Sequence, residues 1–334
     1  MSAPSASPAA AAKAPAAPEA RASRGPLFVA AVIFALLAAI PLVSEVWGGA
    51  WLTSLAVRAM ILAIVAISLD LLMGHGGLVS FGHSAFVAIG AYTCGIMITE
   101  GTYEMALILP TAIAIAATFA LLSGAICLRT SGVSFIMITL AFGQMVYFAL
   151  GSLAQYGGDD GLTLWSGPDL FGTRVLGSEM GVYISVFLLL LGTWALVHRL
   201  VYSRFGRVLR AARQNPTRVA SMGYSVLRYR LVAYVIAGVL AAIAGVLWAT
   251  HASFVSPSLG AWQRSGDLIV MVVLGGMATR NGALVGALFF ILIEETLSAI
   301  THDWRLIFGP LLILIALYAR GGLVGLLDRV RGPQ

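Results

Sequence analysis

Lysine is almost absent from this 334-residue chain, although Lys and Arg together number 20 against 14 acidic residues. The single lysine is Lys13, close to the N-terminus. A phosphate-binding Gly-x-x-x-x-Gly-Lys loop, a Schiff-base lysine and a Ser-x-x-Lys nucleophile pair all need a lysine, so none of them can occur beyond residue 13. If ATP powers this protein, another chain must bind the nucleotide.

Cysteine and histidine are also scarce. The two cysteines, Cys94 and Cys127, lie in separate apolar segments without metal-ligand spacing, which is typical of small packing residues. The five histidines form no His-x-x-x-His pair and no His/Cys cluster, so a structural zinc site is disfavoured. The sequence indicates no bound cofactor, and nothing in it points to nucleic acid as a partner.

Charged residues are also scarce, and their scarcity indicates the class of protein. Only 10% of the residues are charged, whereas 60% are hydrophobic. Stretches such as Leu27 to Val43 and Met105 to Leu128 are apolar all round and have about the 20 residues that cross a bilayer. A soluble protein of this size would show a charged outer face. We therefore expect an all-α polytopic membrane protein in contact with the lipid bilayer.

The apolar pattern divides the chain into two tails and one membrane body. Residues 1–26 have the Ala/Pro/Ser-rich composition of a disordered cytoplasmic tail, with a cleaved signal peptide as the alternative. Residues 27–327 are expected to form the transmembrane domain, and residues 328–334 a second cytoplasmic tail. About ten spans are predicted, some of them short or broken, at 27–47, 51–73, 84–99, 105–128, 132–152, 181–201, 230–250, 266–278, 282–300 and 306–320.

The arginines set the predicted orientation, because positive charge in short loops marks the cytoplasmic side. With both termini cytoplasmic, Arg129, Arg280 and the basic segment 199–230 fall inside. The loop 153–180, which contains four acidic residues, then lies outside. The distribution of basic and acidic residues therefore agrees with an orientation in which both termini are cytoplasmic.

The loop 203–230 carries seven arginines and no acidic residue. Arginines flanking a span can be simple anchors or bind lipid, but the interior of this loop fits two short amphipathic helices. Val208, Ala211 and Ala212 suit the apolar face of the first helix, and Val219 and Met222 that of the second. Pro216 suits a helix start and Gly223 a helix stop, so we expect helices split at Asn215-Pro216 that dock into a groove on a partner.

Two glycine-rich segments interrupt the apolar pattern. The first is "GHGGLVSFGHSAFVAIGAYT" at 74–93, in which glycines break one helix and a small-residue stripe from Ser84 to Gly95 packs the next. The second is "LGGMATRNGALVG" at 274–286. Broken helices at membrane depth are tolerated only against protein or water, so we expect the two segments to face each other along a translocation path or to brace it.

Four segments resemble the permease subunits of ABC importers for branched-chain amino acids, in particular the LivM-type subunit. They are "GLVSFGHSAFVAIGAYT" at 77–93, "YGGDDGLTLW" at 156–165, "GRVLRAARQNPTRVASMGYSVLRYRLVAYVIAGVLAAIAGVLWA" at 206–249 and "VVLGGMATRNGALVGA" at 272–287. The resemblance covers nearly everything after the N-terminal tail. It implies a multi-pass protein of the bacterial inner membrane that is not itself an enzyme.

The resemblance also implies the partners and the roles of residues. The partners are a homologous permease chain of the LivH type, two ATPase subunits and an extracytoplasmic solute-binding protein. The chain would supply half of a path for branched-chain amino acids or similar small polar solutes. The residues expected to couple to an ATPase subunit are Gly206, Arg207, Arg210, Arg213, Pro216 and Gly223. Those expected at the path or its helix breaks are Gly74, Gly77, Ser80, Gly82, His83, Gly275, Gly276, Gly282 and Gly286.

Other mechanisms stay open at this point. Glu294 and Glu295 are intramembrane carboxylates of the kind that an ion-coupled secondary transporter uses, and permeases for urea or short amides resemble this chain as well. Asp70 is twelve residues from Arg58 on one span, too far for direct pairing, so we expect it to reach a neighbouring segment. Gly82-His83-Ser84-Ala85-Phe86 does not complete a Gly-x-Ser-x-Gly elbow, which disfavours a serine hydrolase.

Overall fold

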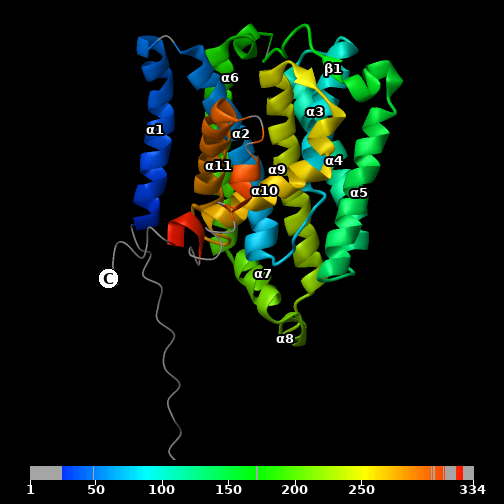
Figure 1. The fold of residues 1–334 in the computed structure, drawn as a ribbon. Helices are drawn as coiled ribbons and strands as arrows, with labels where there is room; N and C mark the ends of the chain where they lie inside the picture. Colours follow the sequence, from blue (N-terminus) through cyan, green and yellow to red (C-terminus); the bar gives the residue numbers. More distant parts are fainter. Residues whose placement is uncertain are drawn as a thin grey trace, which may run out of the picture.

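The computed structural model describes residues 25–47, 49–170, 172–301, 303, 305–310, 312 and 321–325. In this part of the chain most residues are helical, and the long helices run side by side between two ends of the molecule (Figure 1). The helices are α1 (Gly25–Trp47), α2 (Ala50–Asp70), α3 (His83–Thr99), α4 (Met105–Cys127), α5 (Val133–Gly151), α6 (Glu179–Tyr202), α7 (Arg204–Gln214), α8 (Pro216–Ser221), α9 (Val226–Ala252), α10 (Trp262–Gly275) and α11 (Gly282–Ile300).

Seven helices of the described chain are long and apolar enough to cross a membrane: α1, α2 with its continuation to His75, α4, α5, α6, α9 and α11. The predicted spans at 84–99 and 266–278 are helices, but α3 has 17 residues and α10 has 14, below the about 20 that a full span requires. Short or broken segments were predicted among the spans, and α3 and α10 are two of them, whereas the predicted count of about ten stays a prediction. The tails 1–24 and 328–334 and most of the span predicted at 306–320 lie outside the described residues.

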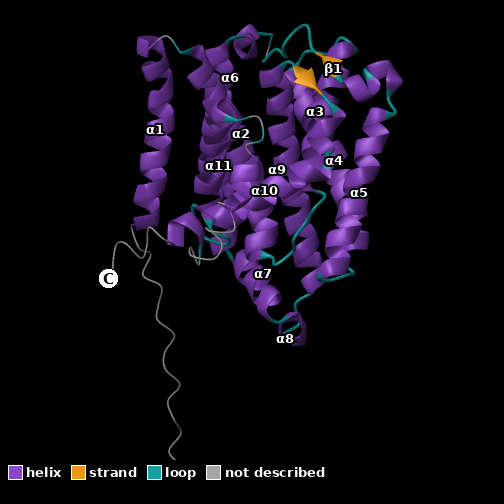
Figure 2. Ribbon diagram, in the orientation of Figure 1, coloured by secondary structure: helices purple, strands orange, loops and turns teal. Residues whose placement is uncertain are grey.

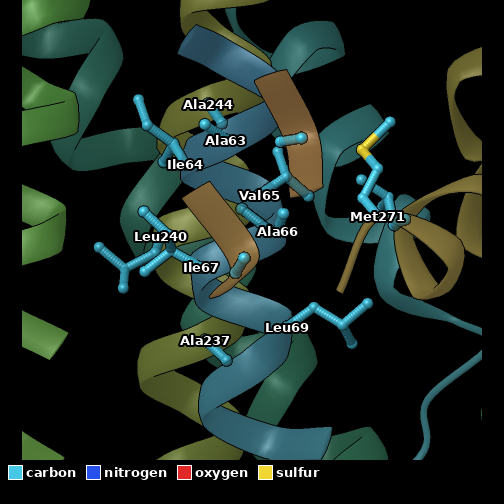
Figure 3. Packing of buried hydrophobic residues seen from close by; sticks show 14 of the residues in the cluster. Ala63, Ile64, Val65, Ala66, Ile67, Leu69, Ala237, Leu240, Ala244 and Met271 are labelled. Carbon is cyan, nitrogen blue, oxygen red and sulfur yellow. The ribbon is translucent and has the colours of Figure 1, made fainter. Parts of the chain in front are cut away.

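Helix α2 is the centre of the bundle. From Ala59 to Asp70 almost all of its side chains are buried, with Ile61, Ile64 and Leu69 fully enclosed. Figure 3 shows Ala237 and Leu240 of α9 on one flank of α2, with Met271 of α10 on the other side. A helix that is apolar all round is the kind that a bundle can enclose completely.

Helices α3 and α9 pack so closely at two glycines that no side chain fits there. A Cβ atom at Gly90 would lie 1.9 Å from the Ala242 carbonyl oxygen, and one at Gly245 would lie 2.0 Å from the Val87 carbonyl oxygen. Glycine at such positions lets helix backbones touch, which is the usual basis of helix association in lipid. The predicted stripe of Ser84, Ala88, Ala91 and Gly95 is buried, but the closest approach to α9 is at Gly90, which is not one of its members.

Helices α1, α4 and α5 present apolar side chains outward. Leu36 of α1, Leu122 of α4 and Phe148 of α5 are each about two thirds exposed in the isolated chain. Such a surface requires an apolar surrounding, which the hydrocarbon of a bilayer or a partner chain provides.

The two ends of the bundle differ in structure. At one end, α7 and α8 project as a hairpin; at the other lie short 3₁₀ turns and a small sheet (Figures 1 and 2). In this sheet β1 (Leu162–Thr163) pairs antiparallel with β2 (Phe254–Val255). The four 3₁₀ turns are Ala154–Tyr156, Gly158–Asp160, Arg174–Gly177 and Pro257–Gly260.

Candidate functional site: two helix breaks and a basic hairpin

The first helix break follows α2. The helix widens into a π-helical turn, Leu71–His75, and the chain then runs without helix until α3 begins at His83. Backbone groups freed by the break find partners: Leu78 N donates to Leu72 O at 3.0 Å, and Phe81 N donates to the Thr139 hydroxyl at 3.3 Å. A π-turn often marks a functional position in a helix.

His83 and Ser80 are fully buried beside this break. His83 Nε2 lies 2.8 Å from the Ser68 hydroxyl, and the ring of Phe86 meets the imidazole at an edge. The Ser80 hydroxyl has no hydrogen-bond partner among the described residues. The geometry is that of a packing histidine held by one hydrogen bond, with no opening toward either side chain.

The second break joins α10 to α11 through Gly276–Asn281. Gly276 and Ala278 both have a positive φ, of 113° and 60°. A Cβ atom at Gly275 would lie 1.8 Å from the Gly282 carbonyl oxygen, and one at Gly286 would lie 2.0 Å from the Met271 carbonyl oxygen. These predicted glycines therefore let two backbones pass in contact and are buried, as are Gly74 and Gly82 of the first break.

The two breaks meet directly. The Ala278 backbone N–H donates to Asp70 Oδ1 at 3.0 Å, and a Cβ atom at Gly74 would lie 2.6 Å from the same nitrogen. The second oxygen of Asp70 lies 3.7 Å from His75 Nδ1. Asp70 thus reaches a neighbouring segment, as expected for a carboxylate that cannot pair with Arg58.

The hairpin consists of α7 and α8, split at Asn215-Pro216 as predicted. The Asn215 side chain caps α8 by accepting from Arg218 N at 3.0 Å, and Pro216 is the first helical residue. Gly223 ends the second helix with a φ of 87°. These are the start and stop signals that the sequence contains.

The buried face of the hairpin differs from the predicted one. The inward residues of α7 are Gly206, Leu209 and Ala212, whereas Ala211 is exposed. In α8 Val219 is buried as expected, but Met222 is 68% exposed. Ala211 and Met222 therefore do not pack against the bundle, and docking of the apolar face into a groove on a partner stays a prediction.

Arg213 connects the hairpin to the first break. Its guanidinium donates to the Gly74 carbonyl oxygen, and its aliphatic part lies over Gly77, where a Cβ atom would be 2.7 Å from Arg213 Cγ. Of the predicted coupling residues, Gly206 is buried, Arg210 is half-buried, and Arg207, Arg213, Pro216 and Gly223 are exposed, although the guanidinium of Arg213 reaches the bundle at Gly74. Arg213, Gly74, Asp70 and Ala278 thus form a continuous connection from the hairpin to the second break.

The intramembrane carboxylate Glu294 is paired. Its Oε2 lies 2.8 Å from the Arg58 guanidinium, at the opposite end of α2 from the first break. Sequence reasoning missed this pair, since the partners are 236 positions apart (58 and 294). The only signal available was a basic residue, Arg58, in one apolar span and two adjacent acidic residues, Glu294 and Glu295, in another.

Comparison with known proteins identifies the family of this chain. Residues 51–317 match the family described as branched-chain amino acid transport system / permease component. The chain is 28% identical over 293 residues to the high-affinity branched-chain amino acid transport permease LivM of Salmonella typhimurium, covering 81% of this chain and 69% of that protein.

Two further relatives are permeases of other kinds. The chain is 25% identical over 269 residues to the ribose import permease RbsC of Escherichia coli, covering 76% of this chain and 80% of the relative. It is 26% identical over 283 residues to the LivH permease of Escherichia coli, covering 79% and 91%. No solved structure matches the chain.

Proposed function

Because the chain belongs to the permease family of branched-chain amino acid transport systems, we propose that it is one transmembrane subunit of an ATP-driven importer. In this proposal it supplies half of the translocation path, and a homologous permease chain of the LivH type supplies the other half. Two ATPase subunits on the cytoplasmic side hydrolyse ATP, in agreement with the absence of lysine from residues 14–334. A solute-binding protein delivers the substrate on the opposite side.

The proposed coupling mechanism rests on one observation. The hairpin is bonded to the first break by Arg213, and the first break is bonded to the second by Asp70. In our proposal, an ATPase subunit binds the exposed side of the hairpin at Arg207, Pro216 and Gly223. Movement of the hairpin is then transmitted through Arg213 to the Gly74 carbonyl. Packed side chains and hydrogen bonds with two discrete arrangements are the physical means by which such coupling acts.

The predicted path residues are assigned a bracing role within this proposal. Gly74, Gly82, Gly275, Gly276, Gly282 and Gly286 are buried, as are Ser80 and His83, whereas Gly77 is exposed. Buried glycines fix how closely the broken helices approach, so they shape a passage between subunits without lining an opening inside this one.

The proposed substrates are branched-chain amino acids or similar small polar solutes. This assignment rests on the names of LivM and LivH, which refer to branched-chain amino acids. RbsC is named for ribose, so members of this group move chemically different solutes. Since the described spans offer few buried charges, we expect the solute-binding protein to select the substrate.

Reconstituted vesicles test the function. The chain is purified with its ATPase, permease and binding-protein partners, and uptake of leucine is measured with ATP or with a proton gradient alone. We expect uptake that requires ATP and stops when the ATPase subunits are omitted. Uptake that follows the proton gradient without ATPase subunits would overturn the proposal and support ion coupling, which the pairing of Glu294 with Arg58 disfavours.

A further inference from the structure

A pocket lies between α6, α7 and the second helix break, at the end of the bundle that bears the hairpin. The residues of interest in its wall are Arg210 of α7, Arg280 of the second break, and His198 and Tyr202 of α6. It is separate from the exposed side of the hairpin to which we assign the ATPase contact.

The pocket brings together two arginines that form no ion pair with a carboxylate of the described chain. The guanidinium carbons of Arg210 and Arg280 lie 5.8 and 5.9 Å from the centre of the same Tyr202 ring. Neither arginine has a carboxylate within 4.0 Å in the part of the chain that the structure describes. The buried Nε of Arg280 has no hydrogen-bond partner there either.

The acidic residue of the pocket does not neutralise them. Asp70 lines the pocket, but one of its oxygens accepts from Ala278 N and the other faces His75. Two like charges gathered on one aromatic ring repel each other and are partly desolvated, so an anion between them would be stabilising. Guanidinium groups offer paired N–H donors that match the oxygens of a phosphate.

The surroundings of the pocket place it at a membrane boundary. Trp194, His198 and Tyr202 follow one another at four-residue spacing along the last turns of α6, with ring centres 5.4 and 4.5 Å apart. Amphipathic aromatic rings are enriched where a span enters the headgroup region. Leu191, three residues before Trp194 on the same face, is exposed, so an apolar surface leads from the bilayer to the pocket.

We propose that this pocket binds a phosphate group, supplied by the headgroup of an anionic lipid from the leaflet on the hairpin side. Basic pockets between membrane helices on this side suit such headgroups. The ligand bridges Arg210 of the hairpin to Arg280 of the second break, at a point distinct from the Arg213 bond. The site requires neither ATP hydrolysis nor bound substrate, so it can be tested apart from transport.

The test uses the purified full-length complex, stripped of lipid in detergent. Native mass spectrometry measures binding of phosphatidylglycerol and of phosphatidylcholine, and thermal melting measures the response to inorganic phosphate. The variants are Arg210→Gln and Arg280→Gln, with Arg218→Gln on exposed α8 as the matched control. We expect phosphatidylglycerol binding to fall by about tenfold or more in each pocket variant, as for loss of one charged hydrogen-bonding partner, and to be unchanged in the control.

The outcomes separate the sources of phosphate. Stabilisation by inorganic phosphate that depends on both arginines, without phosphatidylglycerol binding, would keep the phosphate site but assign it a soluble ligand. Phosphatidylglycerol binding that is equal in the wild type and both Gln variants would overturn the proposal, as would failure of both ligands to bind. Where Arg280→Gln does not fold, Arg280→Lys is measured, and we expect weaker binding because lysine keeps the charge and loses the paired donors.

Discussion

At the scale of single residues, glycine determines how closely the helices of this protein pack. Gly90 and Gly245 allow α3 and α9 to touch, and Gly275 and Gly286 allow the second break to fold back on itself. By contrast, Gly192 in α6 has no atom within 4 Å of where its Cβ would be. The chain therefore contains glycines that are essential for packing and others that are not.

This contrast gives a matched pair of variants. We expect Gly90→Ala to destabilise the protein by about 1–3 kcal/mol, because the new methyl group would overlap the Ala242 carbonyl. Gly192→Ala should be neutral or slightly stabilising, since alanine is the better helix former. Thermal melting of the purified proteins in detergent measures both, and equal melting temperatures would contradict the close packing of α3 on α9.

Asp70 is the residue on which contact between the two breaks depends. Asp70→Ala leaves the Ala278 N–H without its acceptor, which costs about 1–3 kcal/mol for a buried group. Asp70→Asn retains an oxygen at this position. We therefore expect ATP-dependent uptake to be lost in the Ala variant and largely kept in the Asn variant at equal membrane levels. Equal uptake by the two variants would show that the bond to Ala278 is dispensable.

At the scale of elements, the hairpin has an outer side and an inner side with different chemistry. Arg207 and Pro216 face outward, whereas Arg213 reaches the Gly74 carbonyl. The split at Asn215-Pro216 and the stop at Gly223 were predictable, because caps and breakers act through local backbone geometry. The side of α7 that faces inward could not be predicted, because it is set by the contact of α7 with Val201 at the end of α6.

Gly223 offers a test of the hairpin that does not disturb packing. Its φ is 87° and no atom lies within 4 Å of its Cβ position, so a substitution there strains only the backbone. We expect Gly223→Val to cost about 1–2 kcal/mol locally and to reduce co-purification of the ATPase subunits. Gly223→Asn should retain them, because asparagine tolerates this conformation. Loss in both variants would mean that the side chain itself blocks docking.

The bond between the hairpin and the first break can be tested by substituting Arg213. We expect Arg213→Gln to lower uptake while ATPase subunits still bind, since the substitution removes the bond to the Gly74 carbonyl and leaves Arg207, Pro216 and Gly223 unchanged. Arg129→Gln, in the exposed connection between α4 and α5, is the control for lost positive charge. Normal uptake by Arg213→Gln would remove Arg213 from the proposed connection.

At the scale of the whole molecule, composition was sufficient to predict a helical membrane protein, and the apolar runs located most helices. Composition could not settle how deep each helix lies. The segments at α3 and α10 have the apolar character of spans, yet both are short, because α3 begins only after the glycines of the first break and α10 ends at the glycines of the second. The contact between Asp70 and Ala278 likewise could not be predicted from local sequence patterns, since it joins segments 208 residues apart.

The predicted orientation can be measured directly because both native cysteines, Cys94 and Cys127, are buried. Trp165→Cys lies at a position that is 94% exposed at the end bearing the small sheet, and Met222→Cys at one that is 68% exposed on the hairpin. We expect a membrane-impermeant thiol reagent to label Trp165→Cys in intact cells and Met222→Cys only after the membrane is opened. The reverse pattern would invert the topology.

The enclosure of α2 has a consequence for how the protein is made. Arg58 and Asp70 enter the membrane early, but their partners Glu294 and Ala278 are synthesised more than 200 residues later. At about 5–20 residues per second, translation leaves Asp70 without its partner for roughly 10 to 40 s. During this interval the nascent helix holds an uncompensated acid and base in or beside lipid. Insertion of this permease therefore depends on the membrane-insertion machinery, or on water at the bilayer edge, to shelter α2 until the C-terminal helices arrive.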